Sequence, residues 1–573
     1  MKIFPFRRAS WIFLVLALLS IPPPASSAPI ITGGPVNAAG YMLNGLPNSG
    51  IAQGSIFILF GSEMGPGELL QVSAFPIPKD LGGTSIKVTV GAITVDCLIL
   101  YTLNRQVAAI LPSNTPLGNG TVRVTFNGQT SGPAPIQVVQ RRLGVFTRNA
   151  AGSGPAIIQN FTTETNQLPV NSILNAATPG QVEVLWGTGI GPAAGDEAIG
   201  PVPGDMPGLP IEVFVGGQQA AVTYRGRSGC CAGIDQIVFT VPQGVQGCYV
   251  SVAVLIGGVM SNSTTMAIAP QRGPCSDPIH LNSADITQLQ GGGNLNLAEI
   301  TLLRIAGKLS VAGQGPIEGN ADIGQAEFKS VNASDLLASM GIPESPSLGS
   351  CTLLQFQYES FFNSVFGDGG NPIPEQSIDA GPVLNVSGPR GSKQIPRSSP
   401  QSVGNYEARL GGIEIGGPTS PDYLDPGTYT FDNGAGGAAV GPFNTQLILP
   451  SNLLWTNRDT LPAVIPRSQP LHVTWSGADN SAEFVIILGS SANPASGSAV
   501  SFSCAVNAGL GTFIVPARIL SALPASGQAA EGPVGFLVVG KAPLRVASST
   551  AIPNVHIAYK TYLFGNLINT NYQ

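Results

Sequence analysis

A repeated block in the first half of the chain constrains the fold more than any other feature. Residues 54–66 read GSIFILFGSEMGP and residues 180–192 read GQVEVLWGTGIGP, and the two align without a gap. Each block starts at a glycine, runs through apolar residues to an aromatic residue, and then enters a second glycine. An apolar run of this length bounded by glycine is typical of a buried strand that leads into a turn. The block therefore predicts one β-structure that is built twice.

The repeat continues through further strand-like segments in the same order. The matching pairs are 86–90 with 211–215, 106–112 with 236–242, and 121–126 with 249–256, the last pair ending at Asn127-Gly128 and Gly257-Gly258. Period-two alternation indicates half-buried strands, and Asn-Gly or Gly-Gly after a strand indicates a hairpin. Several short strands within about 100 residues are typical of an immunoglobulin-like sandwich. We therefore predict two such units, over residues 30–140 and 143–270.

The second half has a different composition. A Pro- and Gly-rich boundary lies at 270–278, and residues 279–402 read as a mixed, loop-rich region. Within that region, 282–295 looks polar and irregular, 297–305 fits a strand or a short helix, and Ser334 is placed to cap a helix that ends before Gly341. Residues 403–573 are again rich in strand-like segments, which predicts a C-terminal β-sandwich or jelly roll. The predicted fold class is all-β.

Composition excludes some classes of function. Only 10% of the residues are charged, against about 25% in an average protein. The net charge is −6, so the chain lacks the basic face that nucleic-acid binding requires. The hydrophobic content of 43% argues against disorder.

The N-terminus predicts export. Lys2, Arg7 and Arg8 precede an apolar stretch at 11–21, and small residues follow at 25–28. This is the pattern of a secretory signal peptide, which we assign to residues 1–27. No later segment is apolar for long enough to span a bilayer. We expect a secreted or cell-surface protein without a transmembrane segment in its mature chain.

Seven cysteines fit an oxidising location. We expect Cys230 and Cys231 to pair with Cys248 and Cys275, in an order that the sequence leaves open, because neighbouring cysteines bond to each other only with strain. A zinc site at these four cysteines is the alternative, although the CxxC pairs of structural zinc sites are missing. Cys351 and Cys504 either pair or stay free, with pairing favoured. Cys97, in an apolar strand, is expected to be a buried free thiol.

The same residues resemble a known family. Asn37-Ala-Ala, the block at 54–66 and residues 81–88 resemble an uncharacterised secreted family that is abundant in acidobacteria, the Solibacter-type C-terminal domain family. Asn175-Ala-Ala, 187–192 and 235–242 repeat that resemblance, which covers about residues 35–270. It implies Ig-like sandwiches on a secreted or surface protein and brings no established activity. The Cys230-Cys231 pair and the 300 residues that follow depart from the usual pattern of the family.

Candidate chemistry is sparse. The glycines at 187–192 lead into Pro192 instead of a helix, which excludes a dinucleotide-binding loop. The three histidines, His280, His472 and His556, have no motif around them, and no Gly-x-Ser-x-Gly elbow is present. Asp425 and Asp432 flank a strand-like segment at turn sequences. The favoured interpretation is that these two carboxylates stabilise turns. Binding of a calcium ion is the second interpretation, and catalysis is the third.

These observations favour a non-enzymatic structural, adhesive or binding protein of the cell exterior, with no cofactor beyond that calcium. Its expected partner is an extracellular protein or a glycan, and no nucleic acid. The alternative is an extracellular enzyme or a carbohydrate-binding accessory protein whose site lies after about residue 280. That alternative requires a cleft that brings carboxylates or a histidine together.

Overall fold

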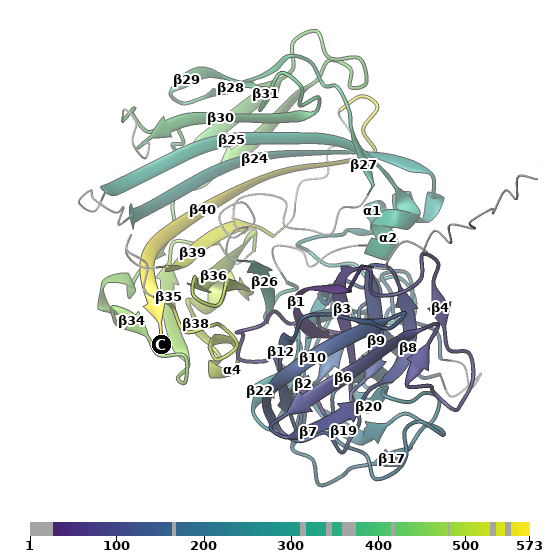
Figure 1. Cartoon of the computed structure of the whole chain (residues 1–573). Coiled ribbons are helices and arrows are strands. Elements are labelled where there is room, and N and C mark those ends of the chain that lie inside the picture. Colours follow the sequence, from purple (N-terminus) through teal and green to yellow (C-terminus); the bar gives the residue numbers. More distant parts are fainter. Residues whose placement is uncertain are drawn as a thin grey trace, which may run out of the picture.

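The computed structural model describes residues 27–162, 168–309, 317–339, 346–357, 374–413, 419–479, 481–527, 534–544 and 552–573. The predicted signal peptide therefore lies outside the described residues except for Ser27. Strands make up most of the regular structure, and the fold is all-β with several sheets (Figure 1). Among the described residues, no helix combines the length and the apolar character needed to cross a bilayer.

The first sandwich consists of two sheets. One has the order β1 (Ile30–Asn37), β3 (Ile56–Ser62), β9 (Gln106–Ile110), β8 (Leu98–Leu103), β4 (Leu70–Gln71). The other has the order β2 (Ile51–Ala52), β12 (Ala134–Val139), β10 (Gly118–Phe126), β6 (Thr84–Val90), β5 (Asp80–Leu81), with β7 (Ile93–Asp96) on β6 and β11 (Gln129–Thr130) on β10. Alternate residues of the strands, such as Phe57, Val88 and Val122, fill the core between the sheets.

The second sandwich is built from one continuous strand path. The order is β13 (Gly144–Val145), β16 (Val182–Thr188), β20 (Asp235–Thr240), β19 (Gln218–Arg227), β18 (Ile211–Val215), β21 (Gly247–Ile256), β23 (Thr264–Ile268), β14 (Gly154–Pro155), with β15 (Ile158–Asn160), β17 (Gly204–Asp205) and β22 (Val259–Met260) at the side. Strand β19 pairs with β18 through its first half and with β20 through its second half. Strand β19 therefore belongs to both sheets of the second sandwich. In the first sandwich, two separate strands take these places: β7 pairs with β6 in one sheet, and β8 pairs with β9 in the other.

The two sandwiches share their pairing pattern. Strand β3 pairs with β9 as β16 pairs with β20, and β6 pairs with β10 as β18 pairs with β21. A short parallel pairing also recurs, β2 with β12 and β14 with β23. The sequence repeat is therefore a repeat of topology.

The C-terminal assembly, residues 294–572, is organised by a ten-stranded sheet. Its order is β26 (Ser350–Gln357), β37 (Ser498–Asn507), β36 (Glu483–Asn493), β39 (Gly535–Pro543), β40 (Ile557–Tyr572), β24 (Asn294–Leu309), β25 (Ile317–Asn332), β27 (Glu375–Ser377), with β30 (Asn405–Gly412) on β25 and β34 (Val464–Ile465) on β40. The long strands β24, β25 and β40 arch side by side across Figure 1. This sheet crosses the boundary expected at 402–403, because β24 pairs in parallel with β40.

Two smaller sheets complete this assembly. They are β29 (Gly391–Pro396), β28 (Val383–Gly388), β31 (Gly427–Asp432), β32 (Asn444–Leu449), and β33 (Leu454–Trp455), β35 (Leu471–Ser476), β38 (Thr512–Val515). Each packs its apolar residues against the ten-stranded sheet and closes a separate core. Buried ion pairs lie on the same sheet: Arg304 contacts Asp322 at 2.6 Å and Lys541 contacts Glu483 at 2.8 Å.

Helices are short. Within the described ranges they are α1 (Ser283–Gly291), α2 (Ala333–Ser339) and α4 (Ala517–Leu520), with 3-10 turns at Arg458–Thr460 and Ala508–Leu510. The segment expected to be irregular, 282–295, thus contains α1. Asn282 and Asp285 form a capping box at the N-terminus of this helix. The helix expected at 334–340 is α2, but it begins at Ala333, so Ser334 lies inside it and is not its cap. The side chain of Asn332 accepts the hydrogen bond from the Ser334 N–H at 2.9 Å. The expected stop residue Gly341 lies outside the described residues.

The disulfide pairing differs from the expected one. Cys248 pairs with Cys275, and Cys230 pairs with its neighbour Cys231. Cys248 begins β21 beside the end of β23, so the chain leaving β23 brings Cys275 to it, with 5.4 Å between the Cα atoms. The loop with Cys230 and Cys231 instead turns toward the first sandwich, where Ala232 packs against Ile56 and Ile110. Cys351 of β26 is joined to Cys504 of β37.

Candidate functional site

A cleft of about 530 Å³ lies where the second sandwich meets the C-terminal assembly. One wall comes from β18, the turn after it and β21, and includes Phe214, Gln218 and Ser251. The opposite wall comes from the segment before β26, from β38 and from α4, and includes Arg518. Clefts between domains are common ligand sites because two surfaces can supply contacts to one ligand.

The outer face of β21 holds the two walls together. Ala253 and Leu255 point away from the core of the second sandwich and join the core cluster of the C-terminal assembly. All ten residues of β21 are buried as a result. On the neighbouring strand, the ring of Phe214 lies 4.1 Å from the guanidinium carbon of Arg518, a cation–π contact.

Several polar side chains in the cleft carry no hydrogen bond to any described residue. Ser251 is only 5% exposed, and its hydroxyl lines the cleft. Gln218, Gln246 and Ser276 are exposed at the rim. Buried hydroxyl groups are ordinarily paired, so the Ser251 hydroxyl is available to a ligand or to water.

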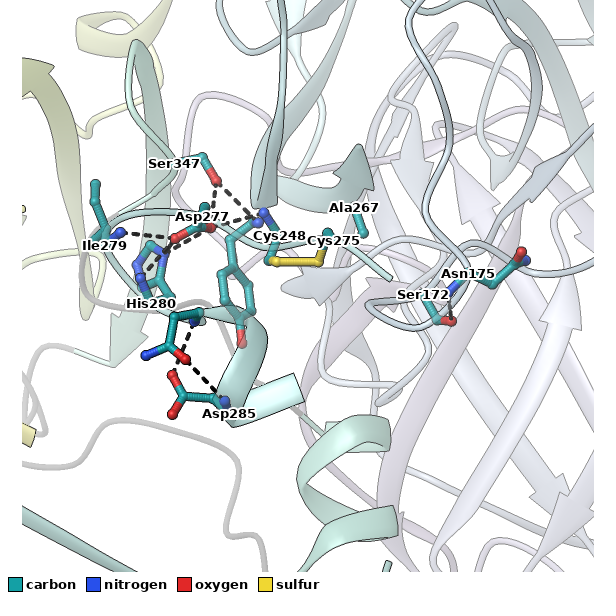
Figure 2. Close-up of a disulfide and its surroundings, with 12 residues drawn as sticks. Ser172, Asn175, Cys248, Ala267, Cys275, Asp277, Ile279, His280, Asp285 and Ser347 are labelled. Carbon is teal, nitrogen blue, oxygen red and sulfur yellow. Dashed lines mark hydrogen bonds and ion pairs between the residues drawn. A yellow bond between two sulfur atoms is a disulfide. The ribbon is translucent and has the colours of Figure 1, made fainter. Parts of the chain in front are cut away.

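Asp277 supports the floor of the cleft, and Figure 2 shows the groups around it. Its carboxylate accepts hydrogen bonds from the N–H groups of Cys248 (2.9 Å), Ile279 (3.0 Å) and His280 (2.7 Å), and from Ser347 Oγ (3.4 Å); His280 Nδ1 lies 3.1 Å away. Burial would raise the pKa of Asp277, but the bonds and charge of His280 and the bond from Cys248 outweigh it and lower the pKa to about 2. Asp277 therefore remains ionised and fixes the 276–280 segment.

A second hollow, of about 240 Å³, lies on the other side of this segment. It is lined by His280, Asp277, Asp285 and Tyr559. The arrangement does not form a Ser-His-Asp triad with Ser347, because Asp277 lies between the serine and the histidine, whereas in a triad the histidine must lie between. Asp285 is engaged in the capping box of α1. The hollow nevertheless brings one histidine and two carboxylates together.

Two disulfides border the cleft. Cys248–Cys275 ties β21 to the segment that carries Asp277, and Cys351 of the Cys351–Cys504 pair lines the cleft itself. Each cross-link lies within one side of the cleft and fixes the segment that lines it.

Asp425 and Asp432, the calcium candidates, both contact protein groups. Asp425 contacts Arg390 Nε at 2.6 Å. Asp432 accepts hydrogen bonds from Asn385 Nδ2 (2.8 Å) and from the backbone N–H of Gly434 (3.0 Å), which is turn chemistry. Among the residues that the structure describes, no three His, Cys, Asp or Glu side chains gather as a metal-binding group.

The other singled-out residues lie apart from the cleft. His472 contacts Thr512 Oγ1 at 2.7 Å, and His556 Nδ1 accepts a hydrogen bond from the Asn296 N–H at 2.8 Å. Cys97 is buried and free, and burial raises the pKa of its thiol.

The cleft could not be located from the sequence, although one signal was present. Within the aligned repeat, Arg123 and Thr125 of the first copy correspond to Ala253 and Leu255 of the second. Residues that are polar on the outer face of the first copy are thus replaced by small or apolar residues in the second copy. Such a change indicates that this face is covered.

No family model matches the chain, and no curated protein matches it. Solved structures that resemble it include SGBP-B from a xyloglucan utilization locus of Bacteroides uniformis, at 12% identity over 67% of this chain and 86% of that one, with a TM-score of 0.16. SGBP-B from a mixed-linkage glucan locus of Bacteroides ovatus, in complex with a heptasaccharide, shows 11% identity over 47% and 69%, with a TM-score of 0.18. The extracellular region of plexin A4 matches at 14% identity over 45% of this chain and 19% of that one, with a TM-score of 0.16. At such TM-scores the similarities support no conclusion about function.

Proposed function

We propose that this chain is a secreted, non-enzymatic binding protein of the cell exterior and that the cleft between the second sandwich and the C-terminal assembly is its ligand site. The observation that carries the proposal is the Ser251 hydroxyl, which has no hydrogen-bond partner among the described residues and lies in a cleft whose rim presents Gln218, Gln246 and Ser276. Secretion is supported by three disulfides, which persist in oxidising compartments. The signal at 1–27 and the family resemblance over 35–270 remain predictions.

The lining suits a ligand that is rich in hydroxyl groups. Side-chain amides and serine hydroxyls both donate and accept hydrogen bonds, as sugar hydroxyls do. Phe214 and Phe513 add apolar surface against which C–H groups can pack. A glycan is therefore the favoured ligand over a purely apolar molecule.

A panel of soluble polysaccharides, measured by affinity electrophoresis with the purified chain, tests this proposal. We expect retardation by at least one polysaccharide. Changing Gln218→Ala together with Gln246→Ala should weaken it at least tenfold without changing the unfolding temperature. Gln219→Ala is the matched control, because Gln219 is exposed next to Gln218 and lies outside the cleft lining. Equal binding by the double variant and the control would contradict the assignment of the cleft.

The second hollow favours one alternative, an extracellular enzyme that uses His280 as a general base. The Nδ1 contact with Asp277 would hold the imidazole ring in place for that role. Turnover of chromogenic glycosides or esters that disappears in His280→Gln and persists in Gln218→Ala would establish the enzyme. Binding without turnover would support the first proposal.

A further inference from the structure

One charged side chain in the cleft has no opposite charge beside it. Arg518 donates a hydrogen bond from Nη2 to the carbonyl of Gly217 at 3.2 Å and stacks on Phe214. Among the described residues, no carboxylate lies within 4.0 Å of its guanidinium group. By contrast, Arg227, Arg304 and Arg397 each contact an aspartate.

Arg518 lies at the interface between the second sandwich and the C-terminal assembly, where an arginine without a carboxylate beside it can bind an anionic ligand. Partial burial lowers the pKa of its guanidinium, with a smaller opposing effect from the charge of Glu212. An arginine stays protonated under such conditions, so a partly desolvated cation remains in the cleft. A carboxylate ligand would compensate that charge through charge-assisted hydrogen bonds.

Asp277, the other charged residue in the lining, does not take this role. Its side chain is 4% exposed, and its oxygens are occupied by the backbone and side-chain donors around it. Arg518 is therefore the charged group of the lining that can still bind an anionic ligand, next to neutral amide and hydroxyl groups at Gln218, Gln246 and Ser251.

We infer that the cleft binds an acidic sugar, a uronate residue of a polysaccharide, with its carboxylate on Arg518 and its hydroxyls on the neutral polar groups. This inference rests on the proposed function and names the ligand class. A uronate carries one carboxylate, which complements Arg518, and several hydroxyl groups, which complement the neutral polar side chains of the lining.

Isothermal titration with three probes tests the inference: an oligogalacturonate, its methyl ester, and a glycine-rich hexapeptide with a free terminal carboxylate. We expect the oligogalacturonate to bind at least tenfold more tightly than its methyl ester, and its affinity to fall as salt is raised, because salt screens the contact with Arg518. Arg518→Gln should remove the preference for the acid. Arg518→Lys, which keeps the charge, should retain part of it. Arg409→Gln is the control, since Arg409 is exposed on β30, outside the cleft lining.

Each other outcome overturns the inference in a recognisable way. Equal affinities for the acid and the ester would overturn the uronate assignment while leaving the binding function in place. Tighter binding of the peptide would show that the carboxylate comes from a protein. Failure of all three probes would overturn the inference, and the polysaccharide panel would then decide the proposed function by itself. A thermal unfolding scan of Arg518→Gln separates loss of the carboxylate contact from loosening of the interface.

Discussion

The two sandwiches of this protein share a strand plan but differ in what covers them. In the first sandwich, the outward residues of β10 and β6 are polar: Thr121, Arg123 and Thr125 on β10, and Lys87 and Thr89 on β6. In the second sandwich, the outward residues of β21 and β18 are Ser251, Ala253 and Leu255, and Glu212 and Phe214. The C-terminal assembly docks on the second set, so a few outward positions decide which copy is covered.

The shared residues explain why the plan is the same in both copies. Gly61 and Gly187 lie where a neighbouring strand approaches so closely that a Cβ atom would meet the backbone of Ile30 or Gly144. Glu63 and Gly189, which differ in sequence, both adopt positive φ, +56° and +115°. Both copies therefore place a residue with positive φ at this turn, although the residue and its exact φ differ.

The largest effect should come from giving the second copy the residue of the first. Ala253→Arg would place a charge in the apolar interface with the C-terminal assembly and should cost about 4 kcal/mol. Urea unfolding and limited proteolysis would report it. The reverse change, Arg123→Ala, loses a hydrogen bond to the Ser131 carbonyl and should cost about 1 kcal/mol or less. Similar costs for the two variants would show that the interface does not depend on this face.

The second-largest loss of stability should come from removing the Cys248–Cys275 disulfide of β21. Cys248 and Cys275 are 27 residues apart, and the first sandwich has no equivalent bridge. Replacing both by serine should lower the free energy of unfolding by about 3 kcal/mol, because the unfolded chain regains the entropy of an open loop. The Cys230→Ser and Cys231→Ser pair should cost less than about 1 kcal/mol, since neighbouring residues close almost no loop. A larger loss in this control would contradict the entropic explanation.

A buried acid in the second copy predicts a pH dependence. Glu183 is 0% exposed, its two oxygens have no partner among the described residues, and the first copy has Phe57 at this position. Burial raises its pKa from 4.5 to about 9. Between these values the unfolded chain loses the proton while the folded chain keeps it, so stability falls as the pH rises.

Glu183→Gln should remove this dependence. The variant and the parent should differ little at pH 4, and the variant should be more stable by about 3 kcal/mol at pH 7. Urea unfolding across the pH range measures the difference. Glu212→Gln, on the exposed side of β18, should change stability by less than about 0.5 kcal/mol at each pH. A difference at position 183 that is constant with pH would mean that Glu183 finds a partner.

The smallest effect concerns Phe214. Phe214→Thr, which installs the residue of the first copy, should cost about 2 kcal/mol through lost burial. Combining it with Arg518→Ala in a double-mutant cycle should reveal a coupling energy of about 1 kcal/mol for the cation–π contact. A coupling near zero would mean that Arg518 is held by Gly217 alone. Thr89→Phe, on the uncovered copy, is the control for the aromatic ring itself.

Much of the fold could be predicted from local patterns. Alternation predicted the strands at 86–90, 211–215 and 249–256, which lie in β6, β18 and β21, because the side-chain period of a strand is a property of the strand alone. The repeated block likewise predicted two sandwiches. The capping pair Asn282 and Asp285 was a visible signal for α1 that the polar composition of the segment concealed.

The cleft could not be predicted, since it depends on contacts between distant parts of the chain. Strand β24 pairs with β40, more than 250 residues later, and Arg518 reaches Phe214 across about 300 residues. The pairing of Cys248 with Cys275 likewise follows from where the chain leaves β23. The strands, their faces and the repeat follow from local periodicity, so they can be read from the chain alone. Which faces are covered, which cysteines meet and where the cleft opens depend instead on how distant surfaces pack together in the folded protein.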